Sequence, residues 1–303
     1  MTWLEGTETD PILPGQRLIT LLNRPQILAA PGAVNALAGL LAKRAGFEAL
    51  YISGGGLTAS MGLPDLGIIG LDELCANVRS IHRATGLPLI VDADTGYGGV
   101  LNAMRTVREL EEAAGAAAIH IEDQQLPKKC GHLNDKRLVP AEDAAAKIAA
   151  AVRARSRMQI IARTDAAAES LDEAIRRGRI YRAAGADIVF PDALRSADEF
   201  RTFAAEVGGT LMANMTEWGR TPYFSANEFQ AMGYRIVIWP VSALRVAAKA
   251  MDALYTHLRR HGTPEGMLDA MQTRAELYEL IGYGDYEALD TAVARSLLPE
   301  IGR

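Results

Sequence analysis

The chain has 303 residues, of which 49% are hydrophobic and 23% are charged, and its formal net charge is −5. This balance argues against non-specific binding to nucleic acid, which requires dense lysine and arginine to displace counterions. A membrane protein is not expected either, because no apolar run reaches the length of a bilayer span and residues 1–10 are acidic, without the apolar core of a signal peptide.

Short apolar runs recur along the chain, and each is followed by a polar cluster and then by an alanine-rich stretch. Runs that are nearly continuous in hydrophobicity are typical of parallel strands covered on both faces. Eight such runs are predicted as strands, at residues 26–30, 49–52, 88–91, 117–121, 159–162, 187–190, 210–213 and 236–239.

Segments with helical periodicity separate these runs. Residues 106–114 and 171–184 are examples, and they lead into Gly115 and Gly185, where a left-handed helix cap is expected. Eight alternations of strand and helix predict a (β/α)₈ TIM-type barrel of the α/β class, with an open doubly wound sheet as the alternative.

The C-terminal part of the sequence predicts helices only. They run from about residue 246 to residue 290 and are clearest at 246–261 and 264–280. These helices exceed what the eighth barrel helix requires, so they are expected to cover the barrel mouth or a neighbouring subunit. We therefore predict a single barrel domain over residues 1–303 with a C-terminal helical segment.

If the fold is a barrel, polar residues should gather where the strands end, because the active sites of such barrels lie at the C-terminal ends of the strands. Six of the predicted strands run into acidic, amide, hydroxyl or guanidinium groups. These groups are Ser53, Asp92, Asp94, Glu122, Asp123, Arg163, Asp165, Asp192, Asn214, Thr216 and Glu217. Helix caps made by Asp and Asn are the alternative reason for polar residues at these ends.

Asp92 and Asp94 are the most specific of these groups. At a spacing of two residues on a strand their side chains share a face, and Asp65, Glu122 and Asp123 are candidates to lie near them. Clustered carboxylates repel one another unless a cation neutralises them, and hard oxygen ligands without a His or Cys cage favour Mg²⁺ or Mn²⁺. The pair predicts a divalent metal site, and an N-cap for the next helix is the alternative.

The run Gly54-Gly55-Gly56 follows the second predicted strand. Glycines allow backbone N–H groups to approach an anion, but the spacing is not that of a dinucleotide or P-loop fingerprint. Together with Ser53, the run predicts either a cradle for a carboxylate or a flexible turn.

The chain contains two cysteines, too few for a disulfide framework, so a reducing compartment, the cytoplasm, is expected. Cys75 falls inside a predicted helix and is expected to be buried. Cys130 stands in a polar loop that also contains Lys128 and His132, and positive neighbours favour the thiolate. We therefore expect a lowered pKa for Cys130, suited to proton transfer or nucleophilic attack. An accidental surface cysteine is the alternative, because a soft-metal site would need further cysteines.

Arginine binds carboxylates through two parallel hydrogen bonds, and three arginines are candidates for this role. Arg163, at a strand end, is the best placed, and Arg245 is the second. Arg274 lies in a helical stretch, where a solvated position is the alternative. His120 is expected to be structural, because it lies within a strand and a ligand role there has no partner.

With these residues assembled, the chain resembles the isocitrate lyase/phosphoenolpyruvate mutase superfamily from about Pro14 to Asp290. The resemblance rests on motifs that occur in order along the chain, at residues 51–56, 62–67, 91–98, 120–124, 127–132, 162–165, 214–217 and 271–274. It implies a (β/α)₈ barrel whose last helix is exchanged between the subunits of a homotetramer.

The resemblance also implies a metal and a set of substrate contacts. Mg²⁺ would bind Asp92 and Asp94, and would be reached through water by Asp65 and Glu122. Residues implied to hold a small di- or tricarboxylate substrate are Ser53, Gly54, Gly55, Gly131, Arg163, Asp192, Asn214, Thr216, Arg245 and Arg274. Phe190 and Ile238 match apolar positions that leave room for a substrate methyl group.

Two departures from the superfamily pattern are present. Asp192 stands where relatives commonly carry a longer glutamate, and the shorter carboxylate is expected to loosen a contact. Residues 133–135 read Leu-Asn-Asp in place of Arg-Pro-Asn, so the loop is expected to close differently, although Lys136 is retained.

The implied activity is Mg²⁺-dependent cleavage of 2-methylisocitrate into pyruvate and succinate by retro-aldol chemistry. Cys130 would act as the general acid, Lys128 and His132 would set its protonation, and Tyr51 is nominated as the base. Alternatives are cleavage of 2,3-dimethylmalate or isocitrate, hydrolysis of oxaloacetate, phosphonopyruvate chemistry, or a non-catalytic barrel. A cysteine in this loop argues against the mutase and hydrolase reactions.

Overall fold

The computed structural model describes residues 2–5 and 12–296. The chain divides into two compact units, Ile12–Arg245 and a smaller unit formed by Met1–Pro11 with Val246–Arg303.

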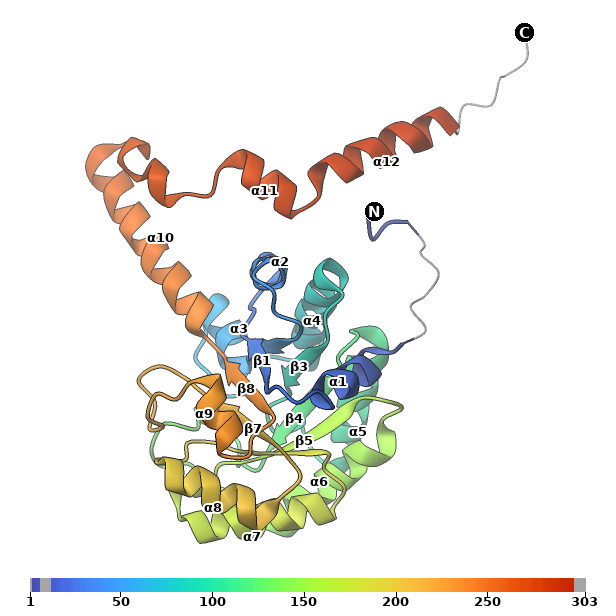
Figure 1. Cartoon of the computed structure of the whole chain (residues 1–303), viewed down its shortest axis with the longest axis vertical. Coiled ribbons are helices and arrows are strands. Elements are labelled where there is room, and N and C mark those ends of the chain that lie inside the picture. Colours follow the sequence, from blue (N-terminus) through green and yellow to red (C-terminus); the bar gives the residue numbers. More distant parts are fainter. Residues whose placement is uncertain (1, 6–11, 297–303) are drawn as a thin grey trace. The chain divides into compact units, whose positions relative to one another are not determined.

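Eight parallel strands form the centre of the first unit (Figure 1). They are β1 (Leu28–Pro31), β2 (Leu50–Ile52), β3 (Leu89–Asp92), β4 (Ala118–Glu122), β5 (Gln159–Thr164), β6 (Ile188–Pro191), β7 (Thr210–Asn214) and β8 (Ile236–Trp239). β1 pairs with β8, the other strands follow in order to β2, and a parallel bridge between Gly32 and Tyr51 joins β2 back to β1. The predicted barrel is confirmed, with strand bounds that differ from the predicted ones by at most two residues, and the open sheet was wrong.

The strands are buried on both faces, as their continuous hydrophobicity predicts. One cluster fills the barrel interior with side chains from all eight strands, among them Tyr51, Ile90, Ile161, Phe190 and Ile238. Residues between these inward positions pack outward against the helices in two further clusters. The barrel is therefore a filled core, and its functional groups lie at its ends.

Helices follow or flank these strands (Figure 1). They are α1 (Pro14–Leu22), α2 (Ala36–Arg44), α3 (Gly54–Ser60), α4 (Leu71–Thr85), α5 (Val100–Arg108), α6 (Ala141–Ala154), α7 (Leu171–Ala183), α8 (Ala197–Val207) and α9 (Ala226–Ala231), with a short 3₁₀ turn at Ala166–Ala168. Cys75 is buried in α4 as expected, and Gly115 and Gly185 have the positive φ angles predicted for them, 79° and 99°. The helix predicted over residues 106–114 is not α-helical throughout, because α5 ends at Arg108 and a π-helix follows from Glu109 to Ala113.

Glu111 lies in this π-helical turn and connects it to the start of β5. Its carboxylate accepts hydrogen bonds from the backbone N–H groups of Ser156 and Met158, each at 2.7 Å, and from that of Arg157. One carboxylate thus satisfies three successive donors that precede a strand, where no helix or sheet partner is available to them.

The C-terminal unit contains α10 (Ser242–His261), which begins in the first unit, a 3₁₀ helix (Glu265–Ala270), α11 (Arg274–Leu280) and α12 (Tyr283–Ser296). The continuous helix predicted at 264–280 was wrong, because residues 271–273 are not helical and Thr273 caps α11 through its side chain. No residue of α10, the 3₁₀ helix or α11 is buried. Between residues 12 and 296, and in residues 2–5, no helix combines the length and apolar character needed to cross a membrane.

The contacts of Glu111 generate a stability prediction. We expect Glu111→Ala to lower the free energy of unfolding in urea by about 2 kcal/mol, because three backbone donors lose a charged acceptor. Glu112→Ala is the matched control: Glu112 is exposed and pairs only with Arg108 in the same helical stretch, so its loss is expected to cost less than about 0.5 kcal/mol. Equal effects of the two substitutions would contradict the assignment.

Candidate active site

Most of the predicted site residues line one cavity of about 290 Å³ at the C-terminal end of the barrel. Its polar lining consists of Tyr51, Ser53, Gly55, Asp65, Asp92, Cys130, Gly131, His132, Arg163, Asp192, Asn214, Thr216 and Arg245. Its apolar side is formed by Ala59 together with Pro240, Val241 and Leu244. The strand ends that sequence patterning singled out therefore converge, and the cavity has a charged face opposite an apolar one.

The glycine run after β2 forms the first turn of α3, so the flexible turn was wrong, and the carboxylate cradle stays a prediction. Ser53 is the N-cap, and its Oγ accepts the Gly56 N–H at 3.1 Å. The glycines are needed because carboxylates lie against them: a Cβ on Gly54 would be 3.0 Å from Asp92 Oδ2, and one on Gly55 would be 2.9 Å from Asp65 Oδ2. Gly54 also donates its N–H to Asp92 Oδ2 at 3.0 Å.

A cluster of carboxylates lies beside this turn, with Lys128 inside it. Lys128 Nζ is 2.6 Å from both Asp65 Oδ1 and Asp94 Oδ1, and its side chain is only 2% exposed. Burial opposes its positive charge, but Glu122, Asp92, Asp94 and Asp65 together raise the pKa of Lys128 well above its ordinary value. The expectation that Lys128 sets the protonation of Cys130 was wrong, because its ammonium group is committed to these carboxylates.

Negative charge in this cluster exceeds what Lys128 neutralises. Burial, followed by the charge of Asp92, raises the pKa of Asp94 to about 6, and burial raises that of Glu122 well above its ordinary value. Both oxygens of the buried Glu122 carboxylate lack a hydrogen-bond partner, and Asp65 Oδ1 and Asp94 Oδ1 share the single ammonium group of Lys128. Asp94 also has a positive φ of 46°, a strained conformation of the kind found at functional sites.

These observations test whether the residues suit Mg²⁺. In the part of the chain that the structure describes, no three His, Cys, Asp or Glu side chains converge into a coordination shell as they stand. The donor chemistry nevertheless fits, because the Asp65 and Asp94 carboxylates lie close together with one lysine between them, and their oxygens are hard ligands suited to a divalent cation. Asp92, Asp94, Asp65 and Glu122 are suited to hold the ion once Lys128 Nζ is displaced from between them.

His120 has a buried partner that the sequence did not reveal. Its Nε2 lies 2.7 Å from the Tyr51 hydroxyl and 3.6 Å from Asp92 Oδ1. Burial lowers the pKa of His120 to about 4, so the ring is neutral. Burial and the charge of Asp92 raise the pKa of Tyr51 well above its ordinary value, which suits the phenol to donate a hydrogen bond and not to act as the base.

Arg163 lies on the cavity floor and is held in place by carboxylates. Its Nε and Nη2 each lie 3.1 Å from an oxygen of Asp165, and Nη2 is 2.8 Å from Asp192 Oδ2. Asp192 also accepts a hydrogen bond from Asn214 Nδ2 at 3.0 Å. The shorter Asp192 therefore still reaches Arg163 and Asn214, and the guanidinium plane is fixed before any substrate arrives.

A buried layer behind the cavity floor was missed by sequence reasoning. The carboxylate of Asp123 accepts hydrogen bonds from Thr164 Oγ1 and Tyr181 Oη at 2.8 Å, from Arg177 at 3.1 Å, and from the Asp165 N–H at 3.0 Å. The available signal was the spacing of Arg177 and Tyr181, four residues apart on one helix face. This layer fixes the backbone of Asp165 and, through it, Arg163.

The loop after β4 carries Cys130 over this floor. Gly131 must be glycine, because a Cβ there would be 1.8 Å from Asp192 Oδ2 and 2.7 Å from Arg163 Nη2. Lys136 donates to the Gly131 carbonyl and to Asp165 Oδ1 at 3.2 Å, so the loop is fastened from below. These contacts of Lys136 explain why it is retained although residues 133–135 depart from the superfamily pattern.

The Cys130 thiol is protonated, contrary to the expectation of a lowered pKa. Cys130 is exposed at the cavity rim, yet the surrounding protein desolvates its sulfur and raises the pKa above the ordinary value of 9.0. A backbone hydrogen bond from His132 and the charge of Arg163 act in the opposite direction, and Asp192 and Asp65 add to the increase. Such a group holds its proton at neutral pH, which fits a proton donor better than a nucleophile.

Three predicted residues lie elsewhere. Phe190 and Ile238 are fully buried in the barrel interior and do not line the cavity, so the apolar side belongs instead to Ala59, Pro240, Val241 and Leu244. Arg274 is the first residue of α11 in the C-terminal unit, and its substrate contact stays a prediction. Arg245 lines the cavity and stacks on Trp218, with 5.0 Å between its guanidinium carbon and the ring centroid.

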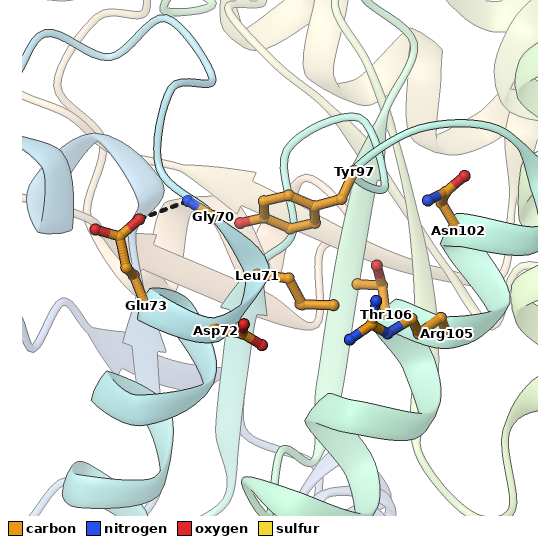
Figure 2. A pocket seen from close by; sticks show the side chains of 8 residues that line it. All are labelled: Gly70, Leu71, Asp72, Glu73, Tyr97, Asn102, Arg105 and Thr106. Carbon is orange, nitrogen blue, oxygen red and sulfur yellow. Dashed lines mark hydrogen bonds between the residues drawn. The ribbon is translucent and has the colours of Figure 1, made fainter.

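A second cavity, of about 490 Å³, opens between the start of α4 and α5 (Figure 2). Tyr97 extends across it towards Gly70, whose N–H donates to Glu73 at 2.6 Å. None of the predicted site residues lines this cavity, so we assign the active site to the cavity at the barrel mouth.

Comparison with known proteins defines the class of this site. The chain matches the phosphoenolpyruvate phosphomutase family over residues 18–259, and it belongs to that family. It is 50% identical to a 2-methylisocitrate lyase of Bacillus subtilis strain 168, over 99% of this chain and 100% of that protein, and 44% identical to one of Escherichia coli K12, over 93% and 97%. The predicted superfamily and the carbon–carbon lyase class are confirmed.

Solved structures of related enzymes share the fold. A 2,3-dimethylmalate lyase superposes with a TM-score of 0.87 at 38% identity, covering 93% of this chain and 96% of that one. An oxaloacetate acetylhydrolase bound to 3,3-difluorooxalacetate gives 0.86 at 36%, covering 94% and 98%. A phosphonopyruvate hydrolase complexed with oxalate and Mg²⁺ gives 0.83 at 32%, covering 92% and 98%.

The protonation state of Cys130 can be measured by alkylation. Because the folded pKa lies above 9.0, the thiolate fraction below that pH is smaller than in an unfolded chain, and we expect slow labelling by iodoacetamide that accelerates only as the pH rises past 9.0. The unfolded protein in urea should label along an ordinary thiol curve. Cys75 is the internal control, because burial raises its pKa to about 11. A labelling curve of Cys130 whose midpoint lies at lower pH than that of the unfolded chain would refute the assignment.

Proposed function

We propose that this protein cleaves 2-methylisocitrate into pyruvate and succinate, with Cys130 as the general acid. The observation that carries the proposal is a protonated thiol at the rim of a cavity whose floor presents Arg163 and whose side presents buried carboxylates. Lyases of this substrate that are up to 50% identical to the whole chain support it.

The chemistry requires that charge be stabilised and a proton delivered. As the carbon–carbon bond breaks, the substrate hydroxyl passes its proton to a carboxylate that lines the cavity, Asp65 or Asp92, and becomes the carbonyl of pyruvate. The bonding electrons pass to the succinate fragment. Arg163 is positioned to stabilise the resulting enediolate. Cys130 then gives its proton to the carbon, and its raised pKa keeps that proton available at neutral pH.

Further residues would bind and orient the substrate. Ser53 and the start of α3 offer N–H groups to the keto-acid portion, and Asn214, Thr216 and Arg245 offer donors to the remaining carboxylates. Tyr51, held by His120 at 2.7 Å, donates its hydroxyl proton in a hydrogen bond instead of serving as the base. His132 Nε2 lies 3.6 Å from Asp192 Oδ1 and so connects the Cys130 loop to the cavity lining.

Mg²⁺ is the proposed cofactor, and Mn²⁺ could replace it. Asp92 and Asp94 would bind the ion directly, and Asp65 and Glu122 would bind it through water. When bound, it supplies Lewis-acid polarisation of the substrate's hydroxyl and carboxylate oxygens. Lys128, released from Asp65 and Asp94, would then be free to turn towards the cavity.

The apolar side of the cavity supports a methylated substrate. Ala59, Pro240, Val241 and Leu244 offer no hydrogen-bonding side chain, and burying a methyl group against such a surface is worth about 0.8 kcal/mol. Cleavage of 2,3-dimethylmalate is the second candidate, because it also places methyl groups beside a carbanion and a lyase of that acid has a closely similar fold.

We further propose a cytoplasmic homotetramer in which the last barrel helix is exchanged between subunits. Exposed apolar side chains in the C-terminal unit support an assembled state, because large unburied apolar side chains often mark an interface. They include Val246 at 72%, Tyr255 at 65% and Met251 at 45% exposure.

The assignment of Cys130 is tested by comparing Cys130→Ser with Cys75→Ala. We expect Cys130→Ser to bind substrate and to lose at least about 10²-fold in kcat, because a hydroxyl is a far weaker acid than a thiol. Cys75→Ala should retain turnover. Keto-acid release from 2-methylisocitrate, isocitrate and 2,3-dimethylmalate is the measurement, and a wild type that cleaves none of them would overturn the proposed function.

The metal site is tested on the protein without substrate. Mg²⁺ should raise the Tm of chelator-treated protein, since a ligand that binds only the native state stabilises it, and chelation should abolish turnover reversibly. Asp92→Asn should remove the Tm response, whereas the exposed Asp72→Asn should preserve it. Full activity in excess EDTA, or an unchanged Tm response in Asp92→Asn, would refute the site.

A further inference from the structure

The loop after β7, residues 217–223, lies directly against the loop that carries Cys130. A Cβ on Gly219 would be 2.7 Å from Nδ1 and 2.9 Å from Cε1 of His132, so the backbone here approaches the imidazole as closely as a glycine allows. Trp218, next to it, has a positive φ of 54°. Such a conformation costs energy in a non-glycine residue, and it turns the chain towards His132.

Arg220 makes three contacts from this loop to the Cys130 loop. Its backbone N–H donates to His132 Nδ1 at 3.0 Å. Its guanidinium donates to the Leu133 carbonyl at 3.4 Å and to Asn134 Oδ1. Leu133 and Asn134 are two of the positions at which the chain departs from the superfamily pattern.

The backbone contact fixes one ring nitrogen of His132, because Nδ1 accepts the Arg220 N–H. The other nitrogen, Nε2, lies 3.4 Å from Asn214 Nδ2. Nε2 faces Asp192 Oδ1 at 3.6 Å, and Asp192 in turn holds Arg163 at 2.8 Å. The loop after β7 is therefore connected through His132 to the cavity floor.

Lys136 and Arg220 fasten the Cys130 loop to two different parts of the molecule, the end of β5 and the loop after β7. Lys136 ties Gly131 to Asp165 beneath the loop, and its side chain is 1% exposed. Arg220 ties residues 132–134 to the loop after β7. Within the described residues no carboxylate forms an ion pair with its guanidinium, whose Nη2 donates to the Cys130 loop.

We propose that Arg220 is a positioning residue that holds Cys130 and His132 in reacting geometry by fastening their loop to the loop after β7. The inference rests on the proposed function in so far as Cys130 is the proton donor. Reacting groups must be placed to a fraction of an ångström, and a displacement of about 1 Å can cost 10²-fold in rate. Loss of the guanidinium contacts should therefore reduce turnover without removing any group that binds the substrate.

The test compares Arg220→Met, Arg220→Lys and Asn134→Ala in the full-length protein. Arg220→Met should lower kcat on the order of ten-fold with KM changed by less than about two-fold, and Arg220→Lys should recover part of the loss by donating to the Leu133 carbonyl. Asn134→Ala should add little to Arg220→Met, since both remove the same contact. Arg201→Met, which removes an exposed arginine paired with Asp198, is the matched control.

The second readout is alkylation of Cys130 at about pH 8, where the desolvated thiol of the intact loop reacts slowly. A loosened loop exposes the sulfur to water, so Arg220→Met should react several-fold faster than the wild type and than Arg201→Met, at equal Tm. If Arg220→Met keeps the kcat and the alkylation rate of the wild type, the proposal is overturned. A fall in kcat with unchanged alkylation, matched by an equal fall in Tm, would also overturn it, because it would indicate general destabilisation.

The two proposals can fail separately. If the wild type cleaves none of the three acids, the proposed function fails, while the alkylation rates still decide whether Arg220 fastens the loop. If the wild type is active and Arg220→Met matches it in both readouts, only the positioning role fails.

Discussion

Buried negative charge is the constraint around which the mouth of the barrel is organised. Asp92 and Glu122 end β3 and β4, and Asp94 follows β3, so all three are removed from water. An ionised carboxylate in such a place is costly unless a cation compensates it. Lys128 and Arg163 supply part of that compensation, each in contact with more than one carboxylate. The remaining unpartnered oxygens account for the suitability of the cluster for a divalent ion. Removing one partner from such a network leaves an uncompensated charge, so its members depend on one another.

The same constraint explains the local structure around the cavity. Glycine is required at Gly54, Gly55 and Gly131 because carboxylate oxygens occupy the space of a side chain there. The buried layer of Asp123 and Arg177 behind β5 fixes Asp165, which in turn orients Arg163. The cavity is thus preorganised by contacts that lie outside it, as electrostatic stabilisation of a developing charge requires.

Cys130 illustrates how tertiary context reverses an inference from neighbours in sequence. Lys128 is two residues away, yet its ammonium group turns inward to Asp65 and Asp94 instead of pairing with the thiol. Desolvation then dominates and holds the proton on sulfur. Phe190 and Ile238 illustrate the same point for shape: both are apolar and near strand ends, but the alternation of side chains places them inside the filled barrel and leaves the apolar side of the cavity to Val241 and Leu244.

The amino-acid sequence by itself determined the barrel, because eight continuous apolar runs separated by helical segments have few ways to bury both faces of every strand. It also determined that polar groups after those strands share one end, which is why Asp92, Arg163 and Asn214 could be assigned to one site. Only the tertiary structure decided which of those groups touch, where Lys128 points, and that His120 contacts Tyr51. It alone revealed Arg220 against His132, 88 residues apart in sequence. The reason is physical: periodicity reports burial along one element, whereas protonation and contact depend on distances between elements that the packed barrel sets.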